Sequence, residues 1–184
     1  MRVIALVFLL LLSACTSNEV APSASPTIDD CSVFELGTTT SFPPIEVECL
    51  QGEKTVRLNE LKGPFILAVW ASWCMPCRDE MPYVQAFKDA YGTQIQVIGY
   101  DILDETSQAI AASVNWKVNI ASVEDPDGVF RSDLGITAPP TTLFVNAQGV
   151  IVHRKFGAVS SVDELVELAQ LHLKVNLSAN PQVP

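Results

Sequence analysis

The stretch WASWCMPCR, residues 70–78, decides the expected fold and chemistry of this chain. It follows an apolar run at residues 65–70 and opens a pattern typical of an amphipathic helix at residues 75–91. Two cysteines separated by two residues can close a small disulfide at a helix N-terminus. The free amide N–H groups and the helix dipole there lower the pKa of a thiol. Because a thiolate in this position attacks other disulfides through a mixed disulfide, the segment predicts thiol–disulfide exchange.

The composition indicates a folded domain and argues against a nucleic-acid-binding protein. A chain of 184 residues suits one domain with accessory segments. Its hydrophobic content of 48% and charged content of 17% exclude a disordered chain. The formal net charge of −10 would be repelled by a phosphate backbone. No glycine-rich phosphate loop or metal-binding helix motif is visible in the sequence, so we expect no cofactor and no metal.

The N-terminus has the features of a targeting signal. Met1-Arg2 precedes an uninterrupted apolar run at residues 3–12, which is shorter than the roughly 20 residues of a transmembrane helix. The run leads into Leu12-Ser13-Ala14-Cys15, which resembles the bacterial lipobox, whose cysteine is lipidated. We therefore predict a lipoprotein signal peptide at residues 1–14 and lipidation of Cys15. The alternative is an ordinary signal peptide cut near Ala14, which would leave Cys15 free.

The segment after this signal predicts a flexible tether. Residues 15–30 are rich in Ser, Pro, Ala and Thr and show no apolar period. We expect the folded domain at residues 31–175 and a disordered tail at residues 176–184. These expectations place the domain outside the cytoplasm, held to a bacterial cell membrane by a lipid anchor.

The cysteine count suggests a second disulfide. Five cysteines are an odd number, which is awkward in an oxidising compartment. With Cys15 assigned to lipid and Cys74 paired with Cys77, Cys31 and Cys49 remain as a pair. In the chain-entropy model, a disulfide over this separation stabilises the fold by about 3 kcal/mol. The alternative, a second redox centre that passes electrons to the first, stays open.

The expected strands and helices alternate along the chain. We expect strands at residues 55–58, 65–70, 95–100, 120–123, 141–145 and 150–154, the last two forming a hairpin. We expect helices at residues 75–91, 105–116, 128–134 and 162–173. The candidate core contacts of the last helix are Leu165, Leu168, Ala169 and Leu171. This order predicts a three-layer α/β/α sandwich with a mixed central sheet and an N-terminal extension.

Residues 31–175 resemble the thioredoxin fold, and within it the TlpA/ResA/CcmG-type extracytoplasmic thioredoxins. The resemblance depends on WASWCMPCR, on Pro82 five residues after the second cysteine, and on Pro140-Thr141-Thr142 before the hairpin. It implies a thiol–disulfide oxidoreductase. A zinc site, which can share the CxxC pattern, would need further ligands that this sequence does not show. A peroxidatic cysteine with its own activating surroundings is not visible either.

The positions in the motif assign roles to its residues. Cys74, at the helix N-terminus, would be the attacking nucleophile, and Cys77, one turn further, the resolving thiol. Pro76 fits the first helical turn, because the N–H that it lacks would be unpaired there. Pro82 lies inside the helix and should kink it.

Glu80 is a candidate proton acceptor for Cys77. At helical spacing it shares a face with Val84, Phe87 and Tyr91, so it should point toward the core, where burial raises the pKa of a carboxyl. The resemblance agrees, since TlpA/ResA-type proteins carry a Glu three residues after the second cysteine. The alternative is an exposed acid in the first turn, favoured by the helix dipole.

The resemblance also implies a substrate groove beside the cysteines. It places Trp73, Met75 and Pro76 along the groove, and it implies a cis peptide bond before Pro140. The residue before this proline normally offers its backbone N–H and C=O to an extended substrate segment. In this chain that residue is Pro139, which has no N–H, so one substrate hydrogen bond should be missing.

The direction of electron flow is the least determined expectation. Met75-Pro76 contains no histidine that would stabilise a reduced thiolate, which favours a moderate or reducing couple. TlpA/ResA-type relatives often reduce cysteines for cytochrome c maturation. We therefore expect a monomer that reduces an exported protein disulfide and receives electrons from a membrane thiol donor. The alternatives are an oxidant or isomerase for exported proteins, and a redox-gated copper-binding protein whose thiolates hold copper(I).

Overall fold

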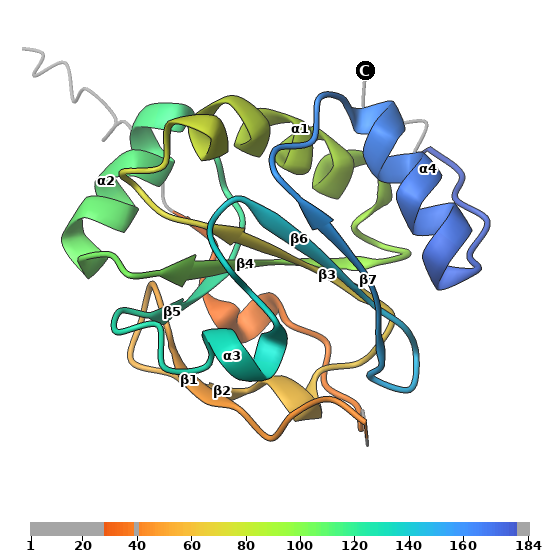
Figure 1. The fold of residues 1–184 in the computed structure, drawn as a ribbon, viewed down its shortest axis with the longest axis horizontal. Helices are drawn as coiled ribbons and strands as arrows, with labels where there is room; N and C mark the ends of the chain where they lie inside the picture. Colours follow the sequence, from red (N-terminus) through yellow and green to blue (C-terminus); the bar gives the residue numbers. More distant parts are fainter. Residues whose placement is uncertain (1–27, 39–40, 180–184) are drawn as a thin grey trace, which may run out of the picture.

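The computed structural model describes residues 28–38 and 41–179 and arranges them as one seven-stranded sheet covered on both faces (Figure 1). The strands are β1 (Glu46–Cys49), β2 (Thr55–Arg57), β3 (Phe65–Trp70), β4 (Gln96–Ile102), β5 (Ser122–Asp125), β6 (Thr141–Val145) and β7 (Ile151–Phe156). The helices are α1 (Met75–Tyr91), α2 (Thr106–Trp116), α3 (Arg131–Leu134) and α4 (Val162–Leu173), with short 3₁₀ helices η1 (Cys31–Val33) and η2 (Leu58–Glu60). The expected signal peptide, the lipidation site Cys15 and most of the expected tether lie outside the described residues.

The sheet is mixed, as expected, and its strand order is β2-β1-β5-β4-β3-β6-β7. The central strand β4 is parallel to both of its neighbours, β3 and β5. The other strand pairs are antiparallel. Parallel pairing places the ends of β3 and β4 side by side, with Trp70 opposite Asp101. The loops that follow these two strands therefore start next to each other.

Alternation along β3 generates the two cores of the domain. Its six residues are all buried: Phe65, Leu67 and Val69 belong to one apolar cluster, and Ile66, Ala68 and Trp70 belong to the other. Helices α1, α2 and α4 cover the second cluster, whereas η1, η2 and α3 lie on the opposite face (Figure 1). The layers confirm the predicted three-layer thioredoxin-like fold.

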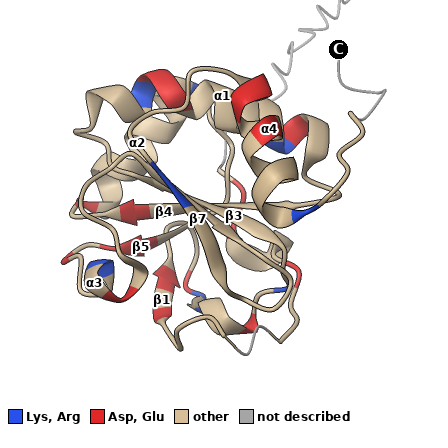
Figure 2. Ribbon diagram, turned by 45° about the vertical axis from the view of Figure 1, so that its right-hand side comes forward, with Lys and Arg blue, Asp and Glu red and all other residues tan. Residues whose placement is uncertain are grey.

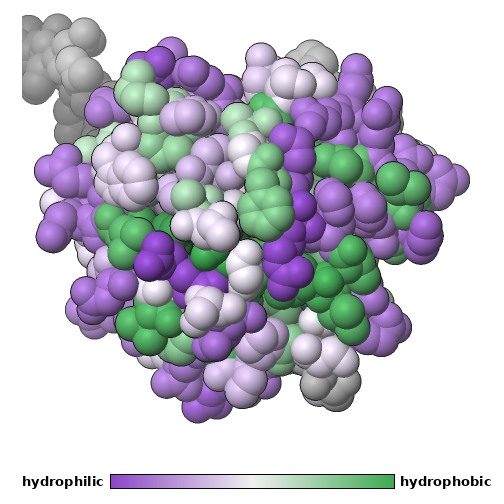
Figure 3. All heavy atoms as spheres, viewed as in Figure 1, coloured by the Kyte–Doolittle hydropathy of each residue, from purple (hydrophilic) through white to green (hydrophobic). Residues whose placement is uncertain are grey.

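Charge is largely excluded from the centre of this sheet. Charged residues lie mainly on the helices, loops and outer strands (Figure 2). Among β3, β4 and β6, which the structure describes in full, the only charged residue is Asp101. On the surface shown in Figure 3, hydrophilic side chains surround smaller apolar areas. Buried charge in the middle of the sheet is therefore an exception.

Helix α1 begins at the predicted residue because its N-terminus is capped by the redox motif itself. The side chain of Cys74 accepts the Cys77 N–H, and Pro76 occupies the first turn, where a missing N–H costs no helical bond. The helix continues past Pro82 to Tyr91. Residues 75–91 thus form one helix, as the sequence predicts.

Several boundaries differ from the expectations. Strand β1 is absent from the predicted set. The helix expected at residues 128–134 is shorter, because α3 covers only Arg131–Leu134. Leu58 begins η2 instead of ending β2. The prediction that Leu171 faces the core is wrong, because its side chain is 59% exposed. The buried residues of α4 are Leu165, Ala169 and Leu173, which follow one another at a spacing of four.

The packed chain extends beyond both expected domain boundaries. Ile28 is buried, and the Asp29 carboxylate contacts the Lys88 ammonium at 2.8 Å, so packing starts inside the segment expected as tether. At the other end, the Ser178 carbonyl accepts a hydrogen bond of 2.7 Å from Gln94. Among the helices in the described ranges, none has the length and apolar character required to cross a bilayer.

Candidate active site

Cys74 and Cys77 form a disulfide at the junction of β3 and α1, with their Cα atoms 5.2 Å apart. Cys74 retains 4% exposure, whereas Cys77 is completely buried. The Cys77 amide N–H donates to the Cys74 sulfur at 3.2 Å. In the reduced protein, this N–H and the helix N-terminus would stabilise a thiolate on Cys74. The geometry distinguishes an outer sulfur from an inner one.

The loop that carries Cys74 is fastened to the loop after β4. The Trp73 indole N–H donates to the Leu103 carbonyl at 2.8 Å, and the Ser72 hydroxyl donates to the Asp104 carboxylate at 2.7 Å. The Ser72 backbone N–H donates to the same carboxylate. A further backbone bond, from Cys74 N to the Ala71 carbonyl at 3.1 Å, closes the turn. These contacts fix the position of the outer sulfur.

Glu80 lies in the core beneath the cysteine motif. Its side chain is 3% exposed, and one carboxylate oxygen accepts a hydrogen bond of 3.2 Å from the Thr142 hydroxyl on β6. Burial raises the pKa of Glu80 to about 7, although the Thr142 hydrogen bond opposes this shift. The predicted inward orientation is confirmed by this burial. A carboxyl with this pKa can exchange a proton at neutral pH.

The segment before β6 lies next to exposed apolar side chains. The peptide bond between Pro139 and Pro140 is cis, and Pro140 is buried. The Gly157 N–H donates to the Pro140 carbonyl at 3.0 Å, which brings the end of β7 to this segment. Phe156, opposite Thr141 in the hairpin, is 56% exposed. Sequence reasoning missed Phe156, because its position at the end of an edge strand gave no signal.

Trp73 and Met75 also present apolar surface at the motif. Their exposed fractions are 55% and 59%, although both are large hydrophobic side chains, and Pro76 between Met75 and Cys77 is exposed as well. Large apolar side chains at the surface often mark binding sites. These residues suit contact with a substrate segment.

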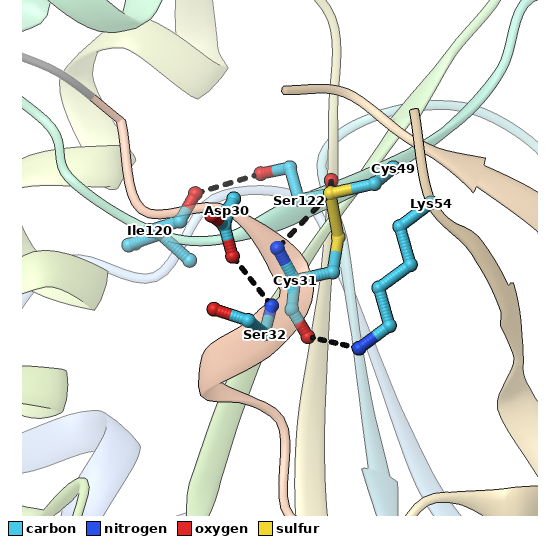
Figure 4. The surroundings of a disulfide bond; sticks show 7 residues. All are labelled: Asp30, Cys31, Ser32, Cys49, Lys54, Ile120 and Ser122. Atoms are coloured by element: carbon cyan, nitrogen blue, oxygen red, sulfur yellow. Dashed lines mark hydrogen bonds between the residues drawn. A yellow bond between two sulfur atoms is a disulfide. The ribbon is translucent and has the colours of Figure 1, made fainter. Parts of the chain in front are cut away.

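The second cysteine pair forms a buried disulfide (Figure 4). The Cα atoms of Cys31 and Cys49 are 5.9 Å apart, and the two residues are 0% and 3% exposed. The Cys31 N–H donates to the Cys49 sulfur at 3.1 Å, and the Lys54 ammonium donates to the Cys31 carbonyl at 3.3 Å. The disulfide therefore attaches η1 to the end of β1.

His153 on β7 and His172 on α4 form a stacked pair, with ring centroids 3.8 Å apart and an interplanar angle of 3°. Burial and the neighbouring His172 lower the pKa of His153. Within residues 28–38 and 41–179, no three His, Cys, Asp or Glu side chains are grouped so that they could hold a metal ion. The stacked pair belongs to the packing of α4 against the hairpin.

Residues 38–154 match the AhpC/TSA family. The chain belongs to the AhpC/TSA family. The chain is also similar to two relatives that are both named thiol:disulfide interchange protein DsbE. The protein from Pseudomonas fluorescens biotype C is 28% identical over 146 residues, covering 76% of this chain and 78% of the relative. The one from Xylella fastidiosa strain 9a5c is 30% identical over 147 residues, covering 77% and 68%.

Solved structures share the fold of this chain. A secreted disulfide oxidoreductase of Mycobacterium tuberculosis aligns with a TM-score of 0.60 and 22% identity, covering 70% of this chain and 96% of that one. A secreted thiol-disulfide isomerase of Corynebacterium glutamicum aligns with a TM-score of 0.60 and 20% identity, covering 84% and 96%. The AhpC/TSA chain described here is a thiol–disulfide oxidoreductase with a thioredoxin-like fold.

Proposed function

We propose that this oxidoreductase works outside the cytoplasm and reduces disulfides of exported proteins through Cys74 and Cys77. The observation that carries the proposal is the difference between the two sulfurs. The Cys74 sulfur caps α1 and accepts an N–H, and the residue retains 4% exposure, whereas Cys77 is completely buried. An outer thiolate can reach a partner disulfide, and an inner thiol can act only on the outer sulfur.

The reaction then proceeds in two exchanges. The Cys74 thiolate attacks one sulfur of the substrate disulfide, forms a mixed disulfide and releases the other substrate sulfur as a thiolate. Cys77 loses its proton and attacks the Cys74 sulfur, which releases the second substrate thiol and leaves Cys74 and Cys77 oxidised. Glu80 is the proposed acceptor of the Cys77 proton, because its pKa of about 7 leaves much of it ionised at neutral pH.

The substrate is proposed to bind as an extended segment along Pro139 and Pro140. Trp73, Met75 and Phe156 offer exposed apolar surface for such a segment. Pro139 provides a carbonyl acceptor but no N–H donor. Recognition at this point therefore relies on one backbone hydrogen bond and on apolar contact.

The cellular context completes the proposal. A signal peptide at residues 1–14 and a lipid on Cys15 would hold the domain, a monomer, at the outer side of the cell membrane. A membrane thiol donor would re-reduce the disulfide, and apocytochrome c is one candidate substrate. The DsbE names of the relatives and the secreted structural neighbours support a location outside the cytoplasm.

The decisive experiment is a redox titration of residues 16–184, in which alkylation and mass mapping identify each cysteine. A two-electron couple at Cys74 and Cys77 near or below about −250 mV would support a reductant. A value of about −120 to −180 mV would make the protein an oxidant or isomerase, which would reverse the proposed direction of electron flow. A Cys74→Ser variant should lose the couple, while the Cys31–Cys49 signal remains.

A further inference from the structure

Asp101 is a buried acid that the exchange reaction described above does not use. It is 0% exposed, and among the described residues neither of its carboxylate oxygens has a hydrogen-bond donor. It occupies the end of β4 opposite Trp70, the last residue before the loop that leads to Cys74. A buried carboxylate without any donor is strongly unfavourable, so this group requires an explanation.

The charges around Asp101 are all of its own sign. Asp104 follows it in the next loop, and Glu124 lies opposite it on β5. Strand β3 and helix α2, which flank it, contain no ionisable side chain. From α1, Arg78 pairs with Asp79 at the surface, and Glu80 is bonded to Thr142. Burial, and then Asp104, raise the pKa of Asp101 to about 8.

Asp104 is the group that connects Asp101 to the cysteine loop. Its carboxylate accepts the N–H and the hydroxyl of Ser72 and the N–H of Glu105. Asp104 also contributes to the raised pKa of Asp101, through its charge and a side-chain interaction, although neither Asp101 oxygen has a donor. A hydrogen bond between the two carboxyl groups requires a proton. Two ionised carboxylates cannot form that bond, because neither has a donor. A proton on Asp101 supplies the missing donor and removes the buried charge.

We propose that Asp101 is a positioning residue for the reaction at Cys74: its neutral carboxyl donates to the Asp104 carboxylate, and the pair holds the loop of residues 71–73. This inference rests on the proposed role of Cys74 as the nucleophile. Asp101 supports Asp104, and Asp104 holds Ser72 by hydrogen bonds. Ser72 lies in the turn that the Cys74 N–H and the Ala71 carbonyl close, and this turn positions the outer sulfur.

The shared proton makes this support dependent on pH. When Asp101 ionises, its proton passes to solvent and two negative charges face each other. Their repulsion weakens the hold of Asp104 on Ser72, and the added negative charge opposes a second anion on Cys74. The pKa of Cys74 should therefore be higher when Asp101 is ionised than when it is neutral.

Infrared spectroscopy of the full-length chain in detergent tests the protonation directly. Because Glu80 also carries a proton at pH 6, the spectra are recorded in a Glu80→Gln background. There we expect a carboxylic-acid C=O band at pH 6 that disappears as the pH passes about 8 and that is missing once Asp101→Asn is added. Glu167→Gln, at an exposed position on α4, removes one charge elsewhere and should keep the band. A band that survives the addition of Asp101→Asn to this background, or the absence of the band from the background itself, would overturn the proposal.

The alkylation rate of Cys74 against pH, measured in a Cys77→Ser background, tests positioning. The alkylation rate of the background should rise with pH in two steps, and that of Asp101→Asn in one. The rate of Asp101→Asn at pH 7 should be preserved, because the amide still donates to Asp104. Asp101→Leu, which cannot donate, should react about fivefold more slowly at pH 7, the equivalent of one hydrogen bond. Identical profiles for the background and Asp101→Asn would contradict the proposal, even if Asp101→Leu does not fold. An oxidising potential at Cys74 and Cys77 would overturn only the proposed direction of electron flow, because neither readout here depends on it.

Discussion

Two buried acids, Glu80 and Asp101, lie on either side of the strand that leads to the cysteine motif. Glu80 contacts β6 through Thr142, and Asp101 on β4 interacts with Asp104. The sequence revealed Glu80 because its helical spacing places it among apolar residues. It did not reveal Asp101, because an acid at the end of an apolar run is also typical of a strand leading into an exposed loop. The influence of Asp104, which raises the pKa of Asp101, is visible only in the folded structure.

Replacing Glu80 with Gln tests its proposed role as a proton acceptor. In the unmodified protein, the rate at which Cys77 resolves the mixed disulfide should rise as the pH passes about 7, where Glu80 ionises. Glu80→Gln should remove that step and slow resolution at pH 8 by about a hundredfold, a typical contribution of general-base catalysis. Stopped-flow measurement of mixed-disulfide decay provides the rates. An unchanged pH profile in Glu80→Gln would show that another group accepts the proton.

At the scale of secondary-structure elements, prediction succeeded where several signals coincided. The bounds of β3, α1 and α4 agree with the expected ones, because apolar periodicity marks these elements and Pro76 marks the start of α1. Strand β1 was missed because it has only four residues and two are acidic. It pairs with β2, which follows after a short turn, and with β5, which is remote in sequence. Long-range pairing of this kind leaves little local trace.

The attachment of η1 to β1 leads to a prediction about the Cys31–Cys49 disulfide. Replacing both cysteines with Ala should lower the free energy of unfolding by about 3 kcal/mol, because the unfolded chain is no longer constrained over this loop. Denaturant unfolding monitored by fluorescence measures the change. The Cys74–Cys77 exchange rate should stay the same, because the second disulfide is buried.

The matched control is the Cys74→Ala/Cys77→Ala double variant, whose much shorter loop should make its loss of stability smaller. If the Cys31→Ala/Cys49→Ala variant instead changed the exchange rate at Cys74, the second disulfide would be a redox partner. The alternative of electron transfer between the two pairs would then replace the structural interpretation.

For the whole molecule, the two buried acids predict a stability that falls as the pH rises. The folded protein raises the pKa of Glu80 to about 7 and that of Asp101 to about 8, both above the values in an unfolded chain. The folded state therefore binds more protons than the unfolded state. The resulting contribution to the free energy of unfolding is fully present below about pH 4 and is lost as the pH rises through 7 and 8.

Thermal unfolding between pH 5 and 9 tests this expectation. The melting temperature of the unmodified protein should decrease over this interval, and the Glu80→Gln/Asp101→Asn double variant should show a flatter profile. The two shifts together span several pKa units, and one unit corresponds to about 1.4 kcal/mol, so the decrease in the free energy of unfolding amounts to several kcal/mol. Equal slopes for the two proteins would mean that these carboxyls are already ionised in the folded state at pH 5.

The contact between Asp29 and Lys88 has a consequence for how the enzyme faces its surroundings. Lys88 lies in the last turn of α1, whereas Cys74 caps the first turn, and fourteen residues of helix separate them by about 20 Å. The N-terminal segment thus enters the domain at the end of α1 remote from the reactive sulfur. A molecule anchored through that segment would carry its nucleophile on the side turned away from the attachment point. Substrates in the aqueous space would reach the Cys74 sulfur directly. A donor embedded in the bilayer would reach this sulfur only if the whole domain rotated about its N-terminal segment.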